Sequence, residues 1–243
     1  MRVSLKKSQM LKTMSIPVWT ARKVIPGQKM AEDIFLAPEI SEVGSSGDSS
    51  IDAINASIGR WNLLQENVLN CTACELHQSR KNPVFGVGNR QADLMIVGEA
   101  PGVDEDIQGE PFIGPSGQLL NKMIFSLGFS REDVYIANIV KCAPSGGRKP
   151  KTGETEACSA FLIRQIELVQ PKVILAVGAT SAKKLLGCDD RISDIRGQVR
   201  IHEQSSIPIL ATFHPAYLLR KPTEKRTVWG DLLLVKKIIA EGV

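Results

Sequence analysis

The sequence of 243 residues contains no apolar run that approaches the roughly 18 residues needed to cross a bilayer. Its start, MRVSLKKSQMLKTMS, lacks the continuous apolar segment of a secretory signal peptide. No internal repeat is visible along the chain. These absences argue against a membrane-spanning, secreted or repeat protein, and we expect a cytoplasmic monomer.

Charge of one sign is missing from each of two N-terminal stretches. Residues 1–30 hold seven Lys and Arg but no acid, whereas residues 31–59 hold six Asp and Glu but no base. Together with the sequence EVGSSGDSS at 42–50, this segregation predicts a disordered tail and linker over 1–59 and a folded domain over 60–243. A basic, acid-free start is also found in mitochondrial presequences, and that alternative stays open.

The remaining chain alternates short apolar runs with amphipathic segments. At 43% hydrophobic and 23% charged residues, the chain has enough apolar surface for a sizeable core. Continuous apolar runs of this length are typical of strands buried on both faces of a parallel sheet. They lie at Leu94–Gly98, Val134–Val140, Val173–Gly178 and Ile207–Phe213. Helical patterns cover 52–69, 116–127, 154–169, 179–186 and 230–240, and 197–203 is a possible additional strand. This order predicts an α/β fold, a three-layer α/β/α sandwich with a central four-stranded parallel sheet.

Four of the five cysteines form a set with the spacing of metal ligands. Cys71 and Cys74 belong to a C-T-A-C motif, and Cys142 and Cys158 follow at a distance. Four thiolates are suited to Zn²⁺ or to an iron–sulfur cluster, and the spacing does not distinguish these. Isolated buried thiols are the simpler explanation, which fits Cys188 but not C-T-A-C.

Several polar and glycine-rich motifs follow the predicted strands, where ligands bind in such sheets. The turn Gly98-Glu99-Ala100-Pro101-Gly102 follows the first strand, and a glycine-rich segment around Phe112 comes next. Asn138 places an amide in an apolar strand, and the segment from His214 to Arg220 follows the fourth strand. Each feature alone is explained equally well by packing or a structural hydrogen bond.

Taken in order, these motifs resemble the family 4 uracil-DNA glycosylases across nearly all of residues 60–243. The resemblance rests on C-T-A-C, GEAPG, PF-x-G-x-x-G-x-L-L, NIVKC, a further cysteine after a gap of 15 residues, and FHPAYLLR. It implies a bacterial enzyme that hydrolyses the N-glycosidic bond of deoxyuridine in DNA, leaving an abasic site for base excision repair. It also implies a [4Fe–4S] cluster on Cys71, Cys74, Cys142 and Cys158.

The same resemblance implies a role for each site residue. Glu99, Asn138 and His214 would be catalytic, and DNA would contact Leu218, as an intercalating wedge, and Arg220. Uracil would be bound by Gly98, Ala100, Phe112, Asn138 and His214.

Two positions depart from the pattern of related glycosylases. Ala100 stands where the best-studied uracil glycosylase family has a water-activating Asp, and Gly147 stands where an Asn is expected at the pocket rim. Three alternatives remain: a broader glycosylase for hypoxanthine or other deaminated bases, a relative that binds uracil covalently, and a non-catalytic DNA-binding module with a Cys₄ metal site.

The tail carries a separate motif. Residues 11–22 have Leu11, Met14, Ile16, Trp19 and Arg22 at spacings similar to the peptide with which the clamp-loader psi subunit binds the chi subunit. Trp and Arg are frequent interface hot spots, so this similarity implies the chi subunit as a partner.

Overall fold

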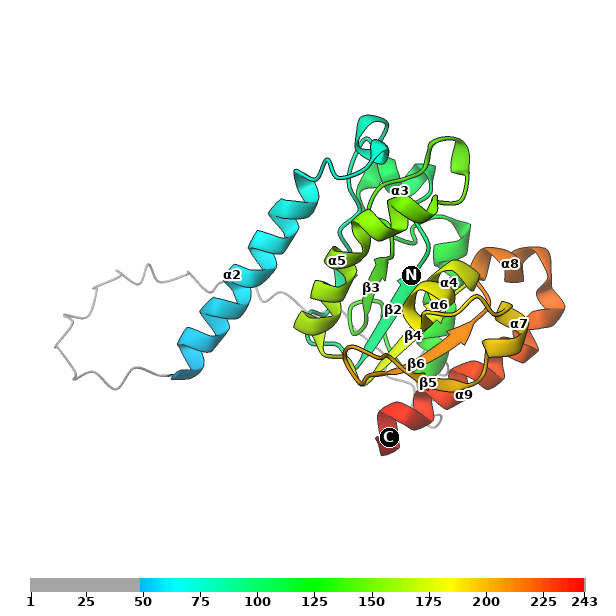
Figure 1. The fold of residues 1–243 in the computed structure, drawn as a ribbon. Helices are drawn as coiled ribbons and strands as arrows, with labels where there is room; N and C mark the ends of the chain where they lie inside the picture. The colour runs from blue at the N-terminus through cyan, green and yellow to red at the C-terminus, as the bar shows by residue number, and fades with distance from the viewer. Residues whose placement is uncertain (1–48, 243) are drawn as a thin grey trace, which may run out of the picture. The chain divides into compact units, whose positions relative to one another are not determined.

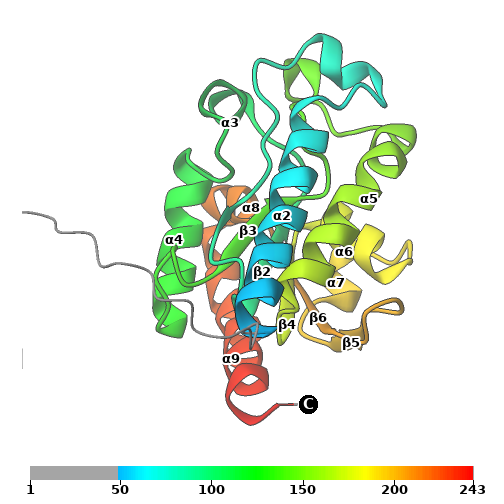
Figure 2. The same cartoon turned by 90° about the vertical axis from the view of Figure 1, so that its left-hand side faces the viewer.

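The computed structural model describes residues 49–242 and places a six-stranded sheet between two layers of helices (Figures 1 and 2). The strand order is β1-β3-β2-β4-β6-β5. The strands are β1 Val87–Gly88, β2 Leu94–Gly98, β3 Tyr135–Asn138, β4 Val173–Val177, β5 Val199–Ile201 and β6 Pro208–Thr212. The predicted three-layer α/β/α fold is confirmed.

The prediction of four strands was wrong for the edges of the sheet. The inner strands β3, β2, β4 and β6 are parallel, as expected, but β1 and β5 add an antiparallel strand at each edge. β1 has only two residues, and Val199 and Ile201 in β5 are exposed. An edge strand needs no continuous apolar run, so β1 left no such signal. The suggested additional strand over 197–203 is confirmed by β5.

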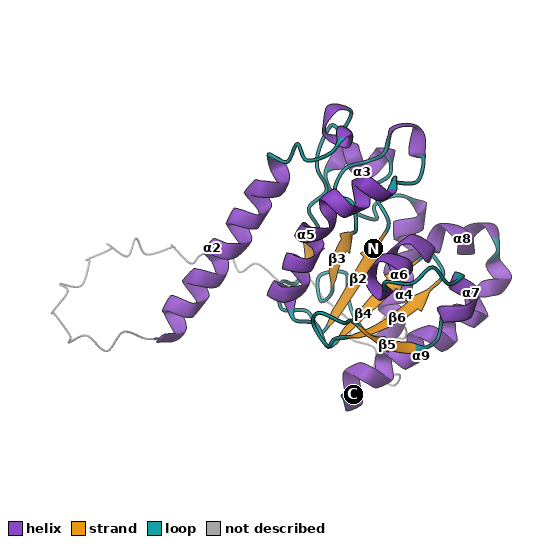
Figure 3. Cartoon of the chain, viewed as in Figure 1, coloured by secondary structure: helices purple, strands orange, loops and turns teal. Residues whose placement is uncertain are grey.

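Helices connect the strands and cover both faces of the sheet (Figure 3). The α-helices are α2 Ser49–Leu69, α3 Val103–Gln108, α4 Pro115–Leu127, α5 Thr152–Val169, α6 Ala179–Leu186, α7 Ile192–Ile195, α8 Pro215–Arg220 and α9 Lys225–Glu241. Short 3₁₀ helices are η1 Glu75–Gln78, η2 Ser145–Gly147 and η3 Pro222–Glu224.

Alternate residues of each inner strand enter two separate hydrophobic clusters. In β2, Met95 and Val97 belong to the cluster formed with α2, α5 and α6, whereas Leu94 and Ile96 belong to the cluster formed with α4 and α9. Successive side chains of a strand point to opposite faces, so both faces of this sheet are buried. The continuous apolar runs of the sequence reflect this burial.

Helix α2 crosses the domain boundary predicted from the sequence. It begins at Ser49 and continues without a break to Leu69, so the boundary at residue 60 falls inside the helix. Charge segregation placed that boundary, but the helix is continuous through 49–69. The remainder of the predicted tail, with the motif at 11–22, lies outside the described residues. Within residues 49–242, no helix is both long and apolar enough to span a membrane.

Candidate active site

The four parallel strands end at one edge of the sheet, and the predicted site residues gather there. β2 ends at Gly98 and β3 at Asn138, and these two residues are paired in the parallel register. β6 ends at Thr212, two residues before His214. This edge is where ligands bind in open α/β sheets.

Asn138 is a buried amide whose side chain lacks a protein partner. It is 1% exposed, and neither Nδ2 nor Oδ1 has a hydrogen-bond partner among the described residues. A Cβ atom on Gly98 would lie 2.3 Å from Asn138 Oδ1 and 2.6 Å from Phe112 Cζ. Glycine at position 98 therefore lets the amide and the aromatic ring approach the end of β2.

Phe112 lies between this amide and the histidine after β6. Its ring stacks on that of His214, with centroids 5.7 Å apart and planes at 29°. The backbone of Phe112 has φ 55°, in the left-handed region that residues with a side chain rarely adopt. Glu105 supports this conformation, because its carboxylate accepts hydrogen bonds from the N–H groups of Phe112 and Gly102.

His214 is neutral at physiological pH. Burial, together with the positive charge of Arg220, lowers the pKa of the imidazole to about 4. Its Nδ1 accepts a hydrogen bond from the backbone N–H of Ala216, at 3.1 Å. Because a neutral imidazole carries one proton, the proton resides on Nε2, which is then a hydrogen-bond donor.

A cavity of about 710 Å³ opens in front of His214. Of the predicted site residues, it is lined by Glu99, Ala100, His214 and Arg220, and Gly147 also lies on its wall. Asn138 and Phe112 are buried and are not among the residues that line this cavity. The sequence analysis did not identify further lining residues, which include Lys149, Gly178 and Ser193. The structure explains why residue 178 is a glycine: its φ is 100°, and a Cβ atom there would press on the side chain of His214.

The structure does not place Leu218 where a DNA wedge would be. Leu218 is 1% exposed and packs in the hydrophobic cluster of α4 and α9. The next residue, Leu219, is 45% exposed. The resemblance that implied this wedge did not account for α8, which begins at Pro215 and turns residue 218 inward.

Two ion pairs that support the site residues could not be identified from the sequence. Arg131 contacts Glu110 at 3.0 Å and donates to the carbonyl of Pro111, next to Phe112. Arg196 pairs with buried Asp231, which also accepts a hydrogen bond from Thr212 Oγ1 at the end of β6. Single charged residues far apart in the sequence give no signal that they will meet.

The four cysteines predicted as ligands line one cavity at the same end of the domain. Cys71 and Cys74 precede η1, Cys142 follows β3, and Cys158 lies in α5. No disulfide joins them, and among residues 49–242 no three His, Cys, Asp or Glu side chains are arranged around a single metal ion. Cys188 lies apart from this cavity.

The surroundings of these thiols contain hydrogen-bond donors to sulfur. Arg80 Nη1 lies 3.0 Å from Cys142 Sγ, and the backbone nitrogen of Lys141 lies 3.2 Å from Cys158 Sγ. Burial raises the pKa of the Cys158 thiol to about 11, with Lys141 opposing the shift. Burial therefore disfavours the ionised form of this thiol, and the positive charge of a bound metal would stabilise it.

Comparison with known proteins assigns this fold and site to a family. The family model of the uracil DNA glycosylase superfamily matches residues 85–233. Type-4 uracil-DNA glycosylases of Archaeoglobus fulgidus and Thermotoga maritima are each 42% identical, over 170 and 180 residues respectively. The alignments cover 68% of this chain and 85% of the first relative, and 73% and 93% for the second. The chain belongs to the uracil DNA glycosylase superfamily and, within it, to the type-4 enzymes. A DNA-binding module without catalysis is not supported.

Proposed function

We propose that this type-4 uracil-DNA glycosylase recognises uracil through Asn138 and stabilises the departing base through His214. The observation that carries the proposal is the buried Asn138 amide, which has no hydrogen-bond partner among the described residues. An unsatisfied buried polar group costs about 1–3 kcal/mol, so folded proteins rarely retain one without a function. A ligand that fills both bonds removes this cost.

The uracil edge complements a carboxamide. The O4 atom of uracil accepts a hydrogen bond from Nδ2 while its N3–H donates one to Oδ1. Cytosine presents the opposite pattern, an amino donor and a ring-nitrogen acceptor, so a fixed amide would be left with two unpaired contacts. A buried site that forms hydrogen bonds discriminates strongly for this reason.

His214 supplies the contact that strengthens during the reaction. As the N-glycosidic bond breaks, negative charge grows on uracil O2 and positive charge on the sugar. The Nε2–H of neutral His214 would donate to O2, and donors directed at developing charge contribute about 10²–10³ in rate. The base then leaves as an anion that needs no prior protonation by the enzyme.

Glu99 is the acidic group proposed to face the sugar. It lines the cavity of His214, where a carboxylate can orient water or offset the charge of the sugar cation. Ala100 has no side-chain oxygen, so it cannot activate water. Glu99 is therefore the residue we assign to that step.

The basic residues at the cavity are proposed to contact DNA phosphates. Lys149 and Arg220 line the wall and are exposed, which suits phosphate binding. A base stacked in DNA must rotate out of the helix to reach Asn138, at a cost of a few kcal/mol. Contacts to the backbone would hold the nucleotide during this step.

We propose that Cys71, Cys74, Cys142 and Cys158 would hold a [4Fe–4S] cluster. All four thiols line the cysteine cavity, and three of them, Cys71, Cys142 and Cys158, receive hydrogen bonds of the kind that stabilise cluster sulfurs. In a cluster each thiolate binds a different iron, so the sulfurs need not converge on one point. A bound cluster would supply structural cross-links between η1, β3 and α5. The assay for this part is iron and sulfide per chain with the visible absorption of the purified protein; colourless protein with one zinc ion would contradict it.

A single-uracil oligonucleotide tests the catalytic proposal. The enzyme should release uracil without added Mg²⁺ and leave an abasic site that alkali cleaves. Asn138→Ala and His214→Ala should each lower the single-turnover rate by about 10²–10³ while DNA binding persists. Near-normal rates in both variants would refute the assignment.

A further inference from the structure

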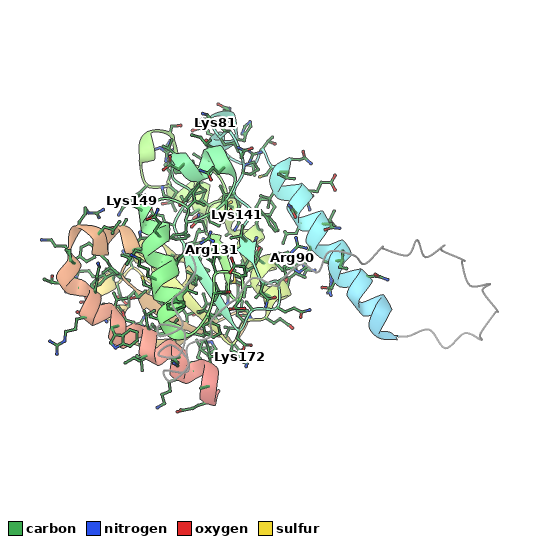
Figure 4. All side chains as sticks on the ribbon, turned by 180° about the vertical axis from the view of Figure 1, so that it is seen from behind. Lys81, Arg90, Arg131, Lys141, Lys149 and Lys172 are labelled. Carbon is green, nitrogen blue, oxygen red and sulfur yellow. The ribbon has the colours of Figure 1, made fainter. Side chains whose placement is uncertain are left out.

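Lys141 is a buried lysine that contacts both the uracil site and the cysteine cavity. Its side chain is 1% exposed, and Figure 4 labels it within the domain. The residue lies three positions after Asn138 and directly before Cys142. Its backbone nitrogen faces Cys158 Sγ, whereas its side chain turns back toward Asn138.

The ammonium group of Lys141 is fixed by two oxygen acceptors. Its Nζ donates to the carbonyl oxygen of Asn138 at 2.8 Å and to Gln165 Oε1 at 2.6 Å. Gln165 is itself fully buried, and its Nε2 donates to the carbonyl of Phe85 and to the hydroxyl of Tyr135. The lysine is thus held by a network that reaches α5, β3 and the loop before β1.

Burying this charge is not explained by stability. Removing an ammonium group from water costs several kcal/mol, and apolar side chains of similar volume often stabilise a protein as well or better. The buried ammonium group bonds to the end of β3, where it fixes the position of the Asn138 carbonyl.

The orientation of the Asn138 side chain depends on its backbone, because no described residue forms a hydrogen bond with its amide. Beyond Asn138, the N–H groups of Ile139 and Val140 bond to the carbonyls of Gly98 and Glu99. Lys141 fixes the carbonyl of Asn138 itself. Removing that contact leaves the Asn138–Ile139 peptide held on one side only, by the bond from the Ile139 N–H to Gly98.

We propose that Lys141 is a positioning residue that holds Asn138 in the orientation that recognises uracil. The inference rests on the proposed role of Asn138 and adds a residue that touches neither base nor sugar. Its side chain acts on the carbonyl, and only its backbone nitrogen bonds to Cys158. The ammonium charge also lowers the pKa of the Cys158 thiol, so iron per chain has to be measured beside uracil binding in any Lys141 variant.

The test is Lys141→Met, which keeps the length of the side chain and removes the ammonium group. The measurement is inhibition of the full-length, metal-loaded enzyme by free uracil, with iron per chain and thermal unfolding determined in parallel. We expect the inhibition constant to rise about tenfold, the effect of losing one hydrogen bond from a charged group. Iron per chain should be retained, because the backbone bond to Cys158 remains.

Lys172→Met is the matched control, since this exposed lysine pairs with Asp93 on the surface. It should leave uracil inhibition unchanged. If Lys141→Met lowers thermal stability or iron content but not uracil affinity, the lysine is structural and the inference is overturned.

If Lys141→Met does not fold, Gln165→Met tests the same proposal. It removes one anchor of Nζ without touching Asn138, and should weaken uracil inhibition severalfold. Unchanged inhibition in this variant would overturn the inference. Asn138→Ala separates the two proposals: if it leaves uracil inhibition intact, the role of Asn138 fails first, whatever Lys141 does.

Discussion

The Nδ1 atom of His214 accepts a hydrogen bond from the backbone N–H of Ala216, with 3.1 Å between the two nitrogens. Helix α8 begins directly after His214, so the first turn of the helix fixes the tautomer of the ring. Burial keeps the ring uncharged. Together these contacts leave Nε2–H as the donor offered to the cavity, which is the state required to stabilise a departing uracil anion.

This geometry predicts that the rate of uracil release does not change near pH 6.5 through protonation of His214. The folded pKa of His214 is about 4, below the ordinary value of 6.5, so the ring stays neutral across the range from about pH 5 to 8. Single-turnover rates across that range should show no inflection from His214. A decline with a midpoint near 6.5 that disappears in His214→Gln would contradict the neutral ring.

The same shift predicts a stability effect with a defined sign. Between pH 6.5 and about 4 the unfolded chain binds a proton that the folded chain does not. The contribution of His214 to the free energy of unfolding is therefore complete above pH 6.5 and is lost as the pH falls through about 4. Urea unfolding across this range should show a smaller loss of stability in His214→Phe than in the unsubstituted protein.

Asn138→Asp should admit cytosine to the site. A protonated carboxyl offers an O–H donor to cytosine N3 and a carbonyl acceptor to its amino group. Burial favours the protonated form, so cytosine release should increase as the pH is lowered. Release of free base from oligonucleotides with a single cytosine measures the effect, and Asn138→Ala is the control, which should act on neither base. An active Asn138→Asp variant that still accepts only uracil would show that residue 138 does not recognise the base.

Much of the fold was predictable because its signals are local. The inner strands appear as apolar runs, and α6 ends at Gly187, a glycine in the left-handed conformation typical of a helix C-terminus. The run at 134–140, however, contains only a four-residue strand, β3. Ile139 and Val140 leave the strand and bond to the carbonyls of Gly98 and Glu99, so they are buried without extending β3. Burial and strand length are separate properties, and an apolar run reports only the first.

The site was predictable where a residue type is unusual for its place. An amide in an apolar strand marked Asn138, and a C-T-A-C motif marked the cysteine cavity. Glu105, Arg196 and Lys141 could not be identified, because their roles depend on partners supplied by other elements. The burial of Leu218 could not be predicted for the same reason: the packing of α8 decides which of two neighbouring leucines is buried.

Asp231→Ala should destabilise the domain strongly. The carboxylate of Asp231 is buried and accepts hydrogen bonds from Arg196 and Thr212, so its removal leaves a half-buried guanidinium without its partner. Breaking a buried pair in this way costs about 3–5 kcal/mol in the free energy of unfolding. Denaturant unfolding measures the change. Asp93→Ala, which breaks the exposed pair with Lys172, should cost no more than about 1 kcal/mol. Equal losses in both variants would contradict the structural role of Asp231.

Substitutions of the two neighbouring leucines of α8 should have different effects: one should lower the stability of the protein and the other its activity on DNA. Leu218 is buried against α4 and α9, so Leu218→Ala should lower the free energy of unfolding by about 2–5 kcal/mol. Leu219 is exposed beside Arg220, and Leu219→Ala should change stability by no more than about 0.5 kcal/mol.

An exposed leucine next to Arg220, which is proposed to bind phosphate, is placed to enter the gap left when a nucleotide rotates out of duplex DNA. Leu219→Ala should therefore lower the rate on double-stranded uracil DNA by about tenfold, since unstacking costs a few kcal/mol. The rate on single-stranded DNA, where there is no base pair to open, should change much less. Single-turnover assays on the two substrates make this comparison directly. An equal loss on both would show that Leu219 supports the cavity itself and does not help to open the duplex.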